Sequence, residues 1–205
     1  MSRAPGPCVD SRVAVADAPD PSAEADLVAG LRSGDSAAFT AVYDRHAPTM
    51  FRFLVRLCGR RDLAEDLFQE LWMRVARHGR RLRPDTRLGP WLYTVARNLV
   101  RSHARWSVGD AAGLAALASW WYLEAPASAP LEAVLAADAA RRLEAGIARL
   151  TASGREVLLL VVVEGLSVDD AARVLKLTSE AARQRLHRAR AELLRCLPMS
   201  DGEKR

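Results

Sequence analysis

The chain has 205 residues, a length that allows two modest helical domains or one larger one, with a sizeable core in either case. Half of the residues are hydrophobic and only 6% are aromatic, and Ala, Leu, Arg and Glu outnumber alternating Val, Ile and Thr, so an all-α fold is favoured over sheet. The formal net charge of +5 indicates an anionic partner, while three widely spaced cysteines and short apolar runs argue against a disulfide framework, a cysteine zinc site and a membrane span.

The N-terminal part predicts a tail followed by short helices. Residues 1–23 contain four prolines and no apolar signal core, so they are expected to form a disordered tail and not a secretion signal. Ser33-Gly34-Asp35 is expected to end the first helix and cap the second, and Gly59 to end the third. The predicted helices run from Ala23 to Leu31, from Ser36 to Arg45 and from Pro48 to Leu57.

The segment from Asp62 to Arg77 is the clearest amphipathic helix of the first half. Its apolar stripe consists of Leu63, Leu67, Leu71 and Val75, widened by Phe68 and Trp72. Its opposite stripe consists of Asp62, Asp66, Gln69 and Met73. We expect the apolar stripe to face the core and the opposite stripe to be free to meet a partner.

A strongly basic segment follows. Between Arg74 and Arg105 there are nine arginines and one acid, Asp85, a net charge of +8. Prolines and glycines predict a basic loop over Gly79 to Pro90, and Pro90 is expected to open a helix from Trp91 to Trp106. The predicted apolar face of that helix is Leu92, Val95, Ala96 and Leu99, and its predicted surface is Tyr93, Thr94, Arg97, Asn98, Arg101 and Arg105. Arginines mixed with Trp91 and Tyr93 suit single-stranded DNA, although Trp91 has an alternative place in the core.

Residues 107–130, rich in Ala, Gly and Pro, are predicted to be a flexible linker. From Ser107 to Asp138 there are four acids and no Lys or Arg, so an acidic stretch separates two basic blocks. This charge pattern is typical of two polyanion-binding modules joined by a linker. The alternative is that the arginines only form solvated helix faces and bind no polyanion. Trp120-Trp121-Tyr122 is unusual in a linker and is expected to pack locally or to contact a partner.

The second module is predicted over 131–197, with a short tail at 198–205. After a helix to Leu150, Ser153 and Glu156 form a capping box that opens a helix over Gly154 to Glu164, and Ser167 and Asp170 form another that opens a helix to Leu175. Lys176-Leu177-Thr178 is a turn, and Thr178 or Ser179 caps a last helix to Leu194. Two helices joined by such a turn, the second rich in Arg, are typical of a helix-turn-helix.

The last helix has a face suited to reading DNA. Its apolar face is Ala182, Leu186, Ala189 and Leu193. On the opposite face Glu180, Gln184 and Arg188 are candidates for base contacts, with Ser179 beside them. Arg183 and Arg185 flank that face and are better placed for phosphates. The alternative for Glu180 is a favourable charge at a helix N-terminus.

Five motifs together resemble a known family. They are Asp62-Leu-Ala-Glu-Asp-Leu-Phe-Gln-Glu70, Pro90-Trp-Leu-Tyr-Thr-Val-Ala-Arg-Asn98, Gly154-Arg-Glu-Val-Leu158, Glu164-Gly-Leu-Ser167 and Arg185-Leu-His-Arg-Ala-Arg190. In this order they resemble regions two and four of sigma-70 family factors of the extracytoplasmic-function (ECF) group, which keeps only those two domains. The resemblance covers residues 24–106 and 131–197.

The resemblance implies an alternative sigma factor that binds RNA polymerase core and promoter DNA. The core-binding residues would be Asp62, Asp66, Gln69 and Met73, which would contact the clamp helices of the largest subunit. The minus-10 DNA-binding residues would be Arg80, Arg81, Arg83, Arg87, Trp91, Tyr93, Arg97, Asn98 and Arg101. The minus-35 DNA-binding residues would be Ser179, Glu180, Arg183, Gln184, Arg185 and Arg188.

It also implies a contact with the flap of the second-largest subunit, an anti-sigma factor as regulator, and a cytoplasmic chain that such a regulator can hold at the membrane. No catalytic activity, cofactor or metal site is expected. The sequence departs from the family at Asp170-Ala-Ala172 in place of Glu-Ile-Ala, at Lys176 in place of Gly, and at Ala181-Ala182 in place of Thr-Val. A non-Gly residue at the turn raises the cost of a left-handed backbone by about 1 kcal/mol.

The same residues also allow two other functions. A helix-turn-helix regulator that never engages polymerase explains 151–194 but gives no role to the acidic stripe or the basic loop. A metal-dependent nuclease would use Asp62, Glu65, Asp66 and Glu70, but these lie around more than half of the helix circumference and no His sits at ligand spacing. His46, His78, His103 and His187 are interpreted as surface or phosphate-proximal residues.

Overall fold

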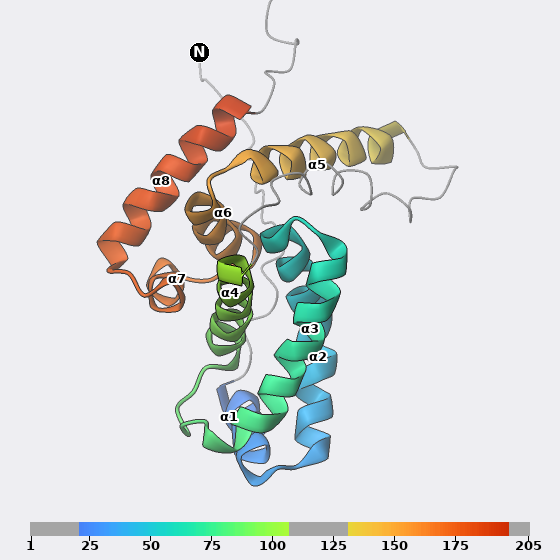
Figure 1. The fold of residues 1–205 in the computed structure, drawn as a ribbon, viewed down its shortest axis with the longest axis vertical. Helices are drawn as coiled ribbons and strands as arrows, with labels where there is room; N and C mark the ends of the chain where they lie inside the picture. The colour runs from blue at the N-terminus through green and yellow to red at the C-terminus, as the bar shows by residue number, and fades with distance from the viewer. Residues whose placement is uncertain (1–20, 107–130, 197–205) are drawn as a thin grey trace, which may run out of the picture.

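The computed structural model describes residues 21–106 and 131–196, and every element within these ranges is a helix (Figure 1). In chain order they are α1 (Pro21–Ser33), α2 (Ser36–Cys58), α3 (Arg61–His78), the 3₁₀ segment η1 (Gly79–Arg81), α4 (Leu88–Trp106), α5 (Leu131–Arg149), α6 (Ala152–Leu158), the π-helical segment η3 (Leu159–Val163), α7 (Val168–Leu175) and α8 (Ser179–Cys196). The all-α prediction is confirmed. The tail predicted over 1–23 is wrong for its last three residues, which belong to α1. Its first 20 residues, the predicted linker over 107–130 with the Trp120 to Tyr122 cluster, and the predicted tail at 198–205 lie outside the described residues.

The first module packs α1, α3 and α4 around α2, and α2 and α3 lie side by side in Figure 1. The apolar stripe of α3 faces this core as predicted: Leu71 and Val75 are fully buried and Leu67 nearly so, while Leu63 is only partly buried. Phe53 of α2 and Tyr93 of α4 meet edge to face in the same core, with ring centroids 5.0 Å apart. Close packing of this core fixes the position and rotation of α3 and α4, and therefore which of their residues face outward.

The helix α2 corrects the prediction of two separate helices. It runs unbroken through Pro48, from the N-cap Asp35, whose side chain accepts from the Ala37 N–H at 2.9 Å, to the left-handed Gly59. Proline removes only one intrahelical hydrogen bond, and both Pro48 and the residue four positions earlier, Asp44, are exposed to solvent. The helix continues because residues on both sides of Pro48, such as Val42 and Met50, bury the same face.

The second module confirms the helix-turn-helix and corrects two boundaries. The box predicted at Ser153 is wrong: Thr151 caps α6, its hydroxyl accepting from the Gly154 N–H at 3.2 Å. The continuous helix predicted to Glu164 instead loosens into η3 before Gly165 ends it. The second box is confirmed, since the Ser167 hydroxyl accepts from the Asp170 N–H at 3.0 Å and donates to the Asp170 carboxylate at 2.7 Å.

Arg155 ties α5 to α6. It is 7% exposed, and its guanidinium donates to the carbonyls of Ile147, Ala148 and Leu150 at 3.2, 2.6 and 3.2 Å. These carbonyls lie at the end of α5, where a helix has no backbone donors left for them and carries a partial negative charge. The buried Arg155 side chain, at the start of α6, therefore supplies the hydrogen-bond donors for the C-terminal carbonyls of α5.

Lys176 supplies the turn of the helix-turn-helix in a left-handed conformation, with φ 57° and ψ 49°. The Lys176 N–H bonds to the Arg173 carbonyl and the Leu177 N–H to the Ala172 carbonyl, so the end of α7 is closed in the way that glycine usually allows. The backbone strain predicted from the absence of glycine is therefore present at this turn.

Lys176→Gly is expected to raise the free energy of unfolding by up to about 1 kcal/mol, because glycine adopts this conformation without steric cost. The measurement is chemical denaturation of the full chain. Lys176→Ala is the control, since it removes the same charged side chain but keeps the β-carbon, and it should bring no such gain. Equal stabilisation by Ala and Gly would mean that the charge and not the backbone sets the effect.

The two modules are joined by packing as well as by the chain. α4 packs on α7 and α2 on α6, and the buried residues of both modules form one continuous apolar cluster. Figure 1 shows α4 beside α6 and α7 of the second module. The faces of α2 and α4 that meet the second module are therefore not solvent-exposed in this arrangement.

Candidate nucleic-acid interface

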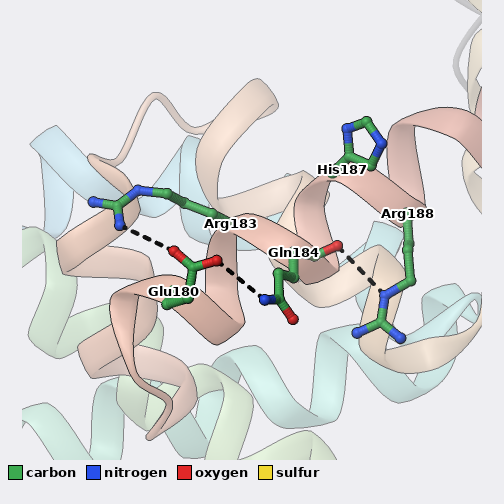
Figure 2. A pocket seen from close by; sticks show the side chains of 5 residues that line it. All are labelled: Glu180, Arg183, Gln184, His187 and Arg188. Carbon is green, nitrogen blue, oxygen red and sulfur yellow. Dashed lines mark hydrogen bonds and ion pairs between the residues drawn. The ribbon is translucent and has the colours of Figure 1, made fainter.

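The outward face of α8 is the best-formed candidate for contact with duplex DNA. Ala182, Leu186 and Ala189 seat the helix on its module, and the Thr178 hydroxyl caps it by accepting from the Ala181 N–H at 3.2 Å. The side chains opposite this buried face line a shallow hollow of the surface, shown in Figure 2. They are Glu180, Arg183, Gln184, His187 and Arg188, all exposed.

Hydrogen bonds order this stripe. The Gln184 amide nitrogen donates to the Glu180 carboxylate at 3.1 Å, which leaves the amide oxygen free to accept from a ligand (Figure 2). Arg188 Nε donates to the backbone carbonyl of Gln184 at 3.4 Å, and its outer nitrogens extend away from the helix. Arg183 lies 3.7 Å from Glu180 and 3.8 Å from Asp169, distances at which exposed ion pairs contribute little. The stripe thus offers both acceptors and donors.

The structure adds one residue to the predicted set and moves two others. His187 lies in the same hollow as Gln184, although its sequence interpretation was only surface or phosphate-proximal. A helical wheel holds the signal, since His187 follows Glu180 by seven positions and Gln184 by three. Ser179 and Arg185 are half-buried and lie outside this hollow, at its borders.

The predicted polar stripe of α3 is exposed as a whole. Its residues Asp62, Asp66, Gln69 and Met73 are all solvent-accessible, and Met73 keeps 48% of its surface exposed. A hydrogen bond from Arg60 at 2.5 Å, assisted by the Leu63 backbone N–H, lowers the pKa of Asp62 to about 2, so that carboxylate stays ionised. The stripe combines fixed negative charge with an exposed apolar side chain.

Aromatic side chains border that stripe. Trp72 lies 4.7 Å from Tyr43 and 6.0 Å from Phe68, measured between ring centroids, and Tyr43 is 37% exposed. Of the four acids that a nuclease would need, Asp62, Glu65 and Glu70 each pair with a neighbouring arginine on the surface of the helix. Among the described residues these carboxylates do not gather into a group that could hold a metal ion.

The basic segment is shorter as a loop than predicted, because η1 begins it and α4 starts at Leu88 and not at Trp91. Arg80, Arg81 and Arg83 are exposed, and Arg83 pairs with Asp85 at 3.0 Å. Trp91 is half-buried against the core, which agrees with its alternative interpretation, whereas Asn98 and Arg101 are exposed on α4. Cations therefore line the approach to α4.

Tyr93 and Arg97 correct the predicted surface of α4, because both are buried, at 5% and 3% exposure. The Tyr93 hydroxyl donates to Glu164 at 2.8 Å, and Arg97 Nε donates to Glu156 at 3.1 Å. Burial and the nearby Glu164 carboxylate raise the pKa of Tyr93, and burial also raises the pKa of Glu164. The predicted surface position is therefore wrong for Tyr93, whose ring packs against Phe53 in the core of the first module. Arg97 is polar as the wheel has it, but the second module covers it.

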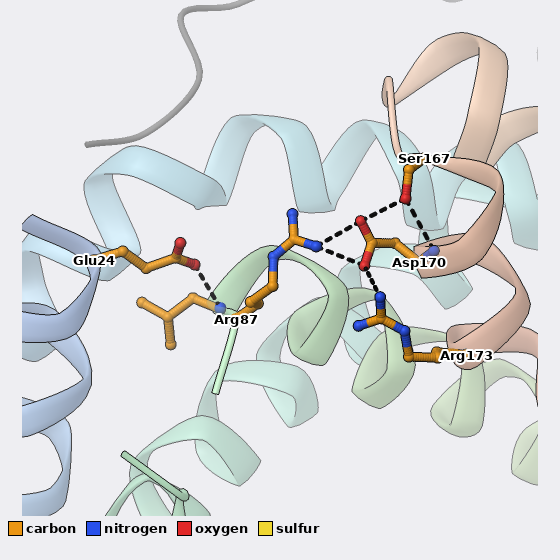
Figure 3. Close-up of polar contacts among 6 residues, drawn as sticks. Glu24, Arg87, Ser167, Asp170 and Arg173 are labelled. Atoms are coloured by element: carbon orange, nitrogen blue, oxygen red, sulfur yellow. Dashed lines mark hydrogen bonds and ion pairs between the residues drawn. The ribbon is translucent and has the colours of Figure 1, made fainter. Parts of the chain in front are cut away.

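Arg87 makes a third contact with the second module, shown in Figure 3, although its side chain remains 58% exposed. Its guanidinium donates to both carboxylate oxygens of Asp170 at 2.6 and 2.7 Å, and Arg173 lies 3.1 Å from the same carboxylate. Burial tends to raise the pKa of Asp170, but the hydrogen bonds from Ser167 and Arg87 outweigh it and lower that pKa. The carboxylate is therefore held ionised against the basic segment.

No helix of the described residues is long and apolar enough to cross a membrane. The family model for Sigma-70 region 2 matches residues 42–106, and the model for Sigma-70, region 4 matches residues 140–193. Both matches lie inside the two helical modules described above.

Relatives with known names agree with these matches. The chain is 34% identical over 165 residues to RNA polymerase sigma factor CarQ of Myxococcus xanthus, covering 80% of this chain and 91% of that protein. It is 31% identical over 177 residues to ECF RNA polymerase sigma factor BldN of Streptomyces coelicolor, covering 84% of this chain and 65% of that protein. The fold is similar to that of the sigma factor RpoE from Bartonella quintana, solved with the anti-sigma factor NepR, with a TM-score of 0.61, 23% identity, and 79% and 98% of the two chains covered. The chain belongs to the sigma-70 family of RNA polymerase sigma factors, in its ECF group, and is an alternative sigma factor that directs transcription initiation.

Proposed function

We propose that this sigma factor uses three separate surfaces for its three contacts. The α3 stripe of Asp62, Asp66, Gln69 and Met73 binds polymerase core, the basic segment with α4 captures the minus-10 strand, and α8 reads the minus-35 duplex. The first two surfaces belong to a module over 24–106 and the third to a module over 131–197, with 107–130 as the linker between them. All three roles consist of binding and require no catalysis by the chain.

The observation that carries this proposal is the stripe on α8. Its apolar face is buried, so only the face with Glu180, Gln184 and Arg188 can enter a major groove. Gln184 and Arg188 are side chains that can make paired hydrogen bonds to base edges, whereas Arg183, His187 and half-buried Arg185 are better suited to phosphates beside them. Glu180 accepts a hydrogen bond from the Gln184 amide and thereby orients it.

The α3 stripe supports a protein contact better than a nucleic-acid contact. Exposed carboxylates would repel DNA phosphates, while the exposed Met73 and the neighbouring Tyr43 provide apolar area of the kind that protein interfaces bury. We assign this surface to the clamp helices of the largest polymerase subunit, and further contacts with the flap of the second-largest subunit to the second module. The RpoE relative was solved with an anti-sigma factor, and we propose that a protein of that kind also regulates this chain.

The test is transcription in vitro with purified core polymerase and a promoter library. The expected result is selective initiation at a set of promoters that share minus-35 and minus-10 elements. A chain that bound promoter DNA but neither bound core nor supported initiation would instead be a helix-turn-helix regulator, and the assignment of the α3 stripe would be wrong.

Gln184→Ala is expected to relax sequence preference at one or two positions of the minus-35 element, by about 1 to 3 kcal/mol, because a bidentate base contact would be lost. The measurement is binding of the full chain with core to promoter variants substituted at each position. Arg185→Ala is the control: a lost phosphate contact should weaken binding equally on all sequences and lower its salt dependence. Uniform weakening by Gln184→Ala would assign that side chain to phosphate as well.

A further inference from the structure

The contacts between the two modules have a common polarity. Donors come from α2, the basic segment and α4 of the first module, and the carboxylates that accept them come from the second module. The pairs are Arg56 with Glu144 at 2.7 Å, Arg87 with Asp170 at 2.6 Å, Tyr93 with Glu164 at 2.8 Å and Arg97 with Glu156 at 3.1 Å. A row of carboxylates therefore lies along the cationic side of the first module.

Arg97 and Glu156 are the most enclosed of these pairs, with side chains 4% and 12% exposed. Arg97 also donates to the Val174 carbonyl of α7 at 3.4 Å, so the second module supplies two acceptors for its guanidinium. Removing one partner of a buried ion pair is costly because the other is left charged and without water. Breaking this pair should therefore cost much more free energy than breaking one of the exposed ion pairs on α3.

The donors in these pairs are the same groups that a nucleic-acid strand needs. Arg87, Tyr93 and Arg97 belong to the proposed minus-10 surface, and guanidinium groups bind carboxylates and phosphates with similar paired geometry. In this arrangement one nitrogen of Arg87, Nη1, donates to both oxygens of Asp170 (Figure 3). By contrast, the α3 stripe and the Glu180 to Arg188 stripe of α8 remain exposed in the same arrangement.

We propose that the second module is an internal stand-in for the minus-10 strand. Its carboxylates Glu156, Glu164 and Asp170 occupy the donors of Arg97, Tyr93 and Arg87. The free chain therefore presents its polymerase-binding face and its minus-35 face, but only the outer part of its minus-10 surface. Lifting α6 and α7 from α4 exposes the rest of that surface, and DNA phosphates then replace the carboxylates at the same donors. This inference rests on the proposed role of α4 in capturing the minus-10 strand.

The test uses the full chain with Glu156→Gln and Glu164→Gln together, which keep the size of both side chains and remove their charge. The control is Glu65→Gln with Asp169→Asn, which also removes two negative charges that face arginines, but at exposed positions outside the module interface. The radius of gyration is measured by small-angle X-ray scattering. Affinity is measured with a fluorescein-labelled single-stranded oligonucleotide of about 12 nucleotides.

The expected result is a larger radius of gyration and oligonucleotide binding tighter by about tenfold relative to the control pair, with unchanged helix content by circular dichroism. A chain as compact and as weak in binding as the control would overturn the proposal. So would a chain that opens without binding more tightly, because the carboxylates would then join the modules without masking a nucleic-acid surface.

Asn98→Ala with Arg101→Ala, added to the opened chain, separates this proposal from the proposed minus-10 role. Both residues are exposed on α4 and make none of the contacts across the module interface given above. Loss of most of the gained affinity would support both proposals. Retention of the full affinity would reject α4 as the minus-10 surface, while the scattering result would still decide whether the carboxylates hold the chain closed.

Discussion

Asp66→Arg should weaken binding of core polymerase by at least about thirtyfold, or about 2 kcal/mol, and should remove promoter-specific initiation with it. Asp66 is exposed near the centre of the α3 stripe, and Met73 lies about two helical turns further along the same face. Reversing a charge in the middle of a protein interface both loses its attraction and places a repulsive group against the partner. The measurement is equilibrium binding of the labelled full chain to core.

Asp44→Arg is the matched control, because it makes the same charge reversal at an exposed position of α2 in the same module. It should leave core affinity within a few fold. Both variants should keep their helix content and their binding to minus-35 duplex DNA. Unchanged core affinity in Asp66→Arg would remove the α3 stripe from the polymerase interface, whatever the second module does.

Arg155→Met should lower the free energy of unfolding by about 3 to 5 kcal/mol, measured by chemical denaturation. Methionine fills much of the same volume, but the Ile147, Ala148 and Leu150 carbonyls lose a charged donor at the end of α5. Burial lowers the pKa of Arg155, yet an arginine remains charged at any pH at which the protein is studied, so the loss should be nearly independent of pH.

Arg149→Met is its control, since Arg149 lies in the last turn of the same helix but is exposed. Its loss should cost less than about 1 kcal/mol, the usual size of a charge effect at a helix end. Similar destabilisation by the two variants would mean that the helix dipole, and not the buried hydrogen bonds of Arg155, carries the effect.

Helical periodicity predicted the faces of α3 and α8 well, because burial on one side and exposure on the other follow directly from the spacing of apolar residues. It identified the exposed stripe of Asp66 and the seated face of Leu186. Turn chemistry also carried over: Asp35 and Ser167 cap helices as predicted, and Lys176 takes the left-handed position that its place in the turn demands.

The contacts of Tyr93 and Arg97 with the second module could not be predicted in the same way. A wheel separates apolar from polar positions on one helix, but it holds no information on which other helix approaches the polar side. The partners Glu164 and Glu156 lie 71 and 59 residues further along the chain. The unbroken helix through Pro48 and the π-helical segment η3 could not be predicted for a related reason. Tertiary packing, and not local propensity, decides whether a helix continues through an unfavourable turn.

The enclosed pair of Arg97 and Glu156 also has an evolutionary consequence. Because either charge alone would be stranded away from water, a substitution at one position is tolerated only when the other changes too. Across related sigma factors, the residues at positions 97 and 156 should therefore vary together. The first and second modules of one protein should then evolve as a matched pair. Chimaeras that exchange second modules between relatives would work only where the donor carries an acid opposite Arg97.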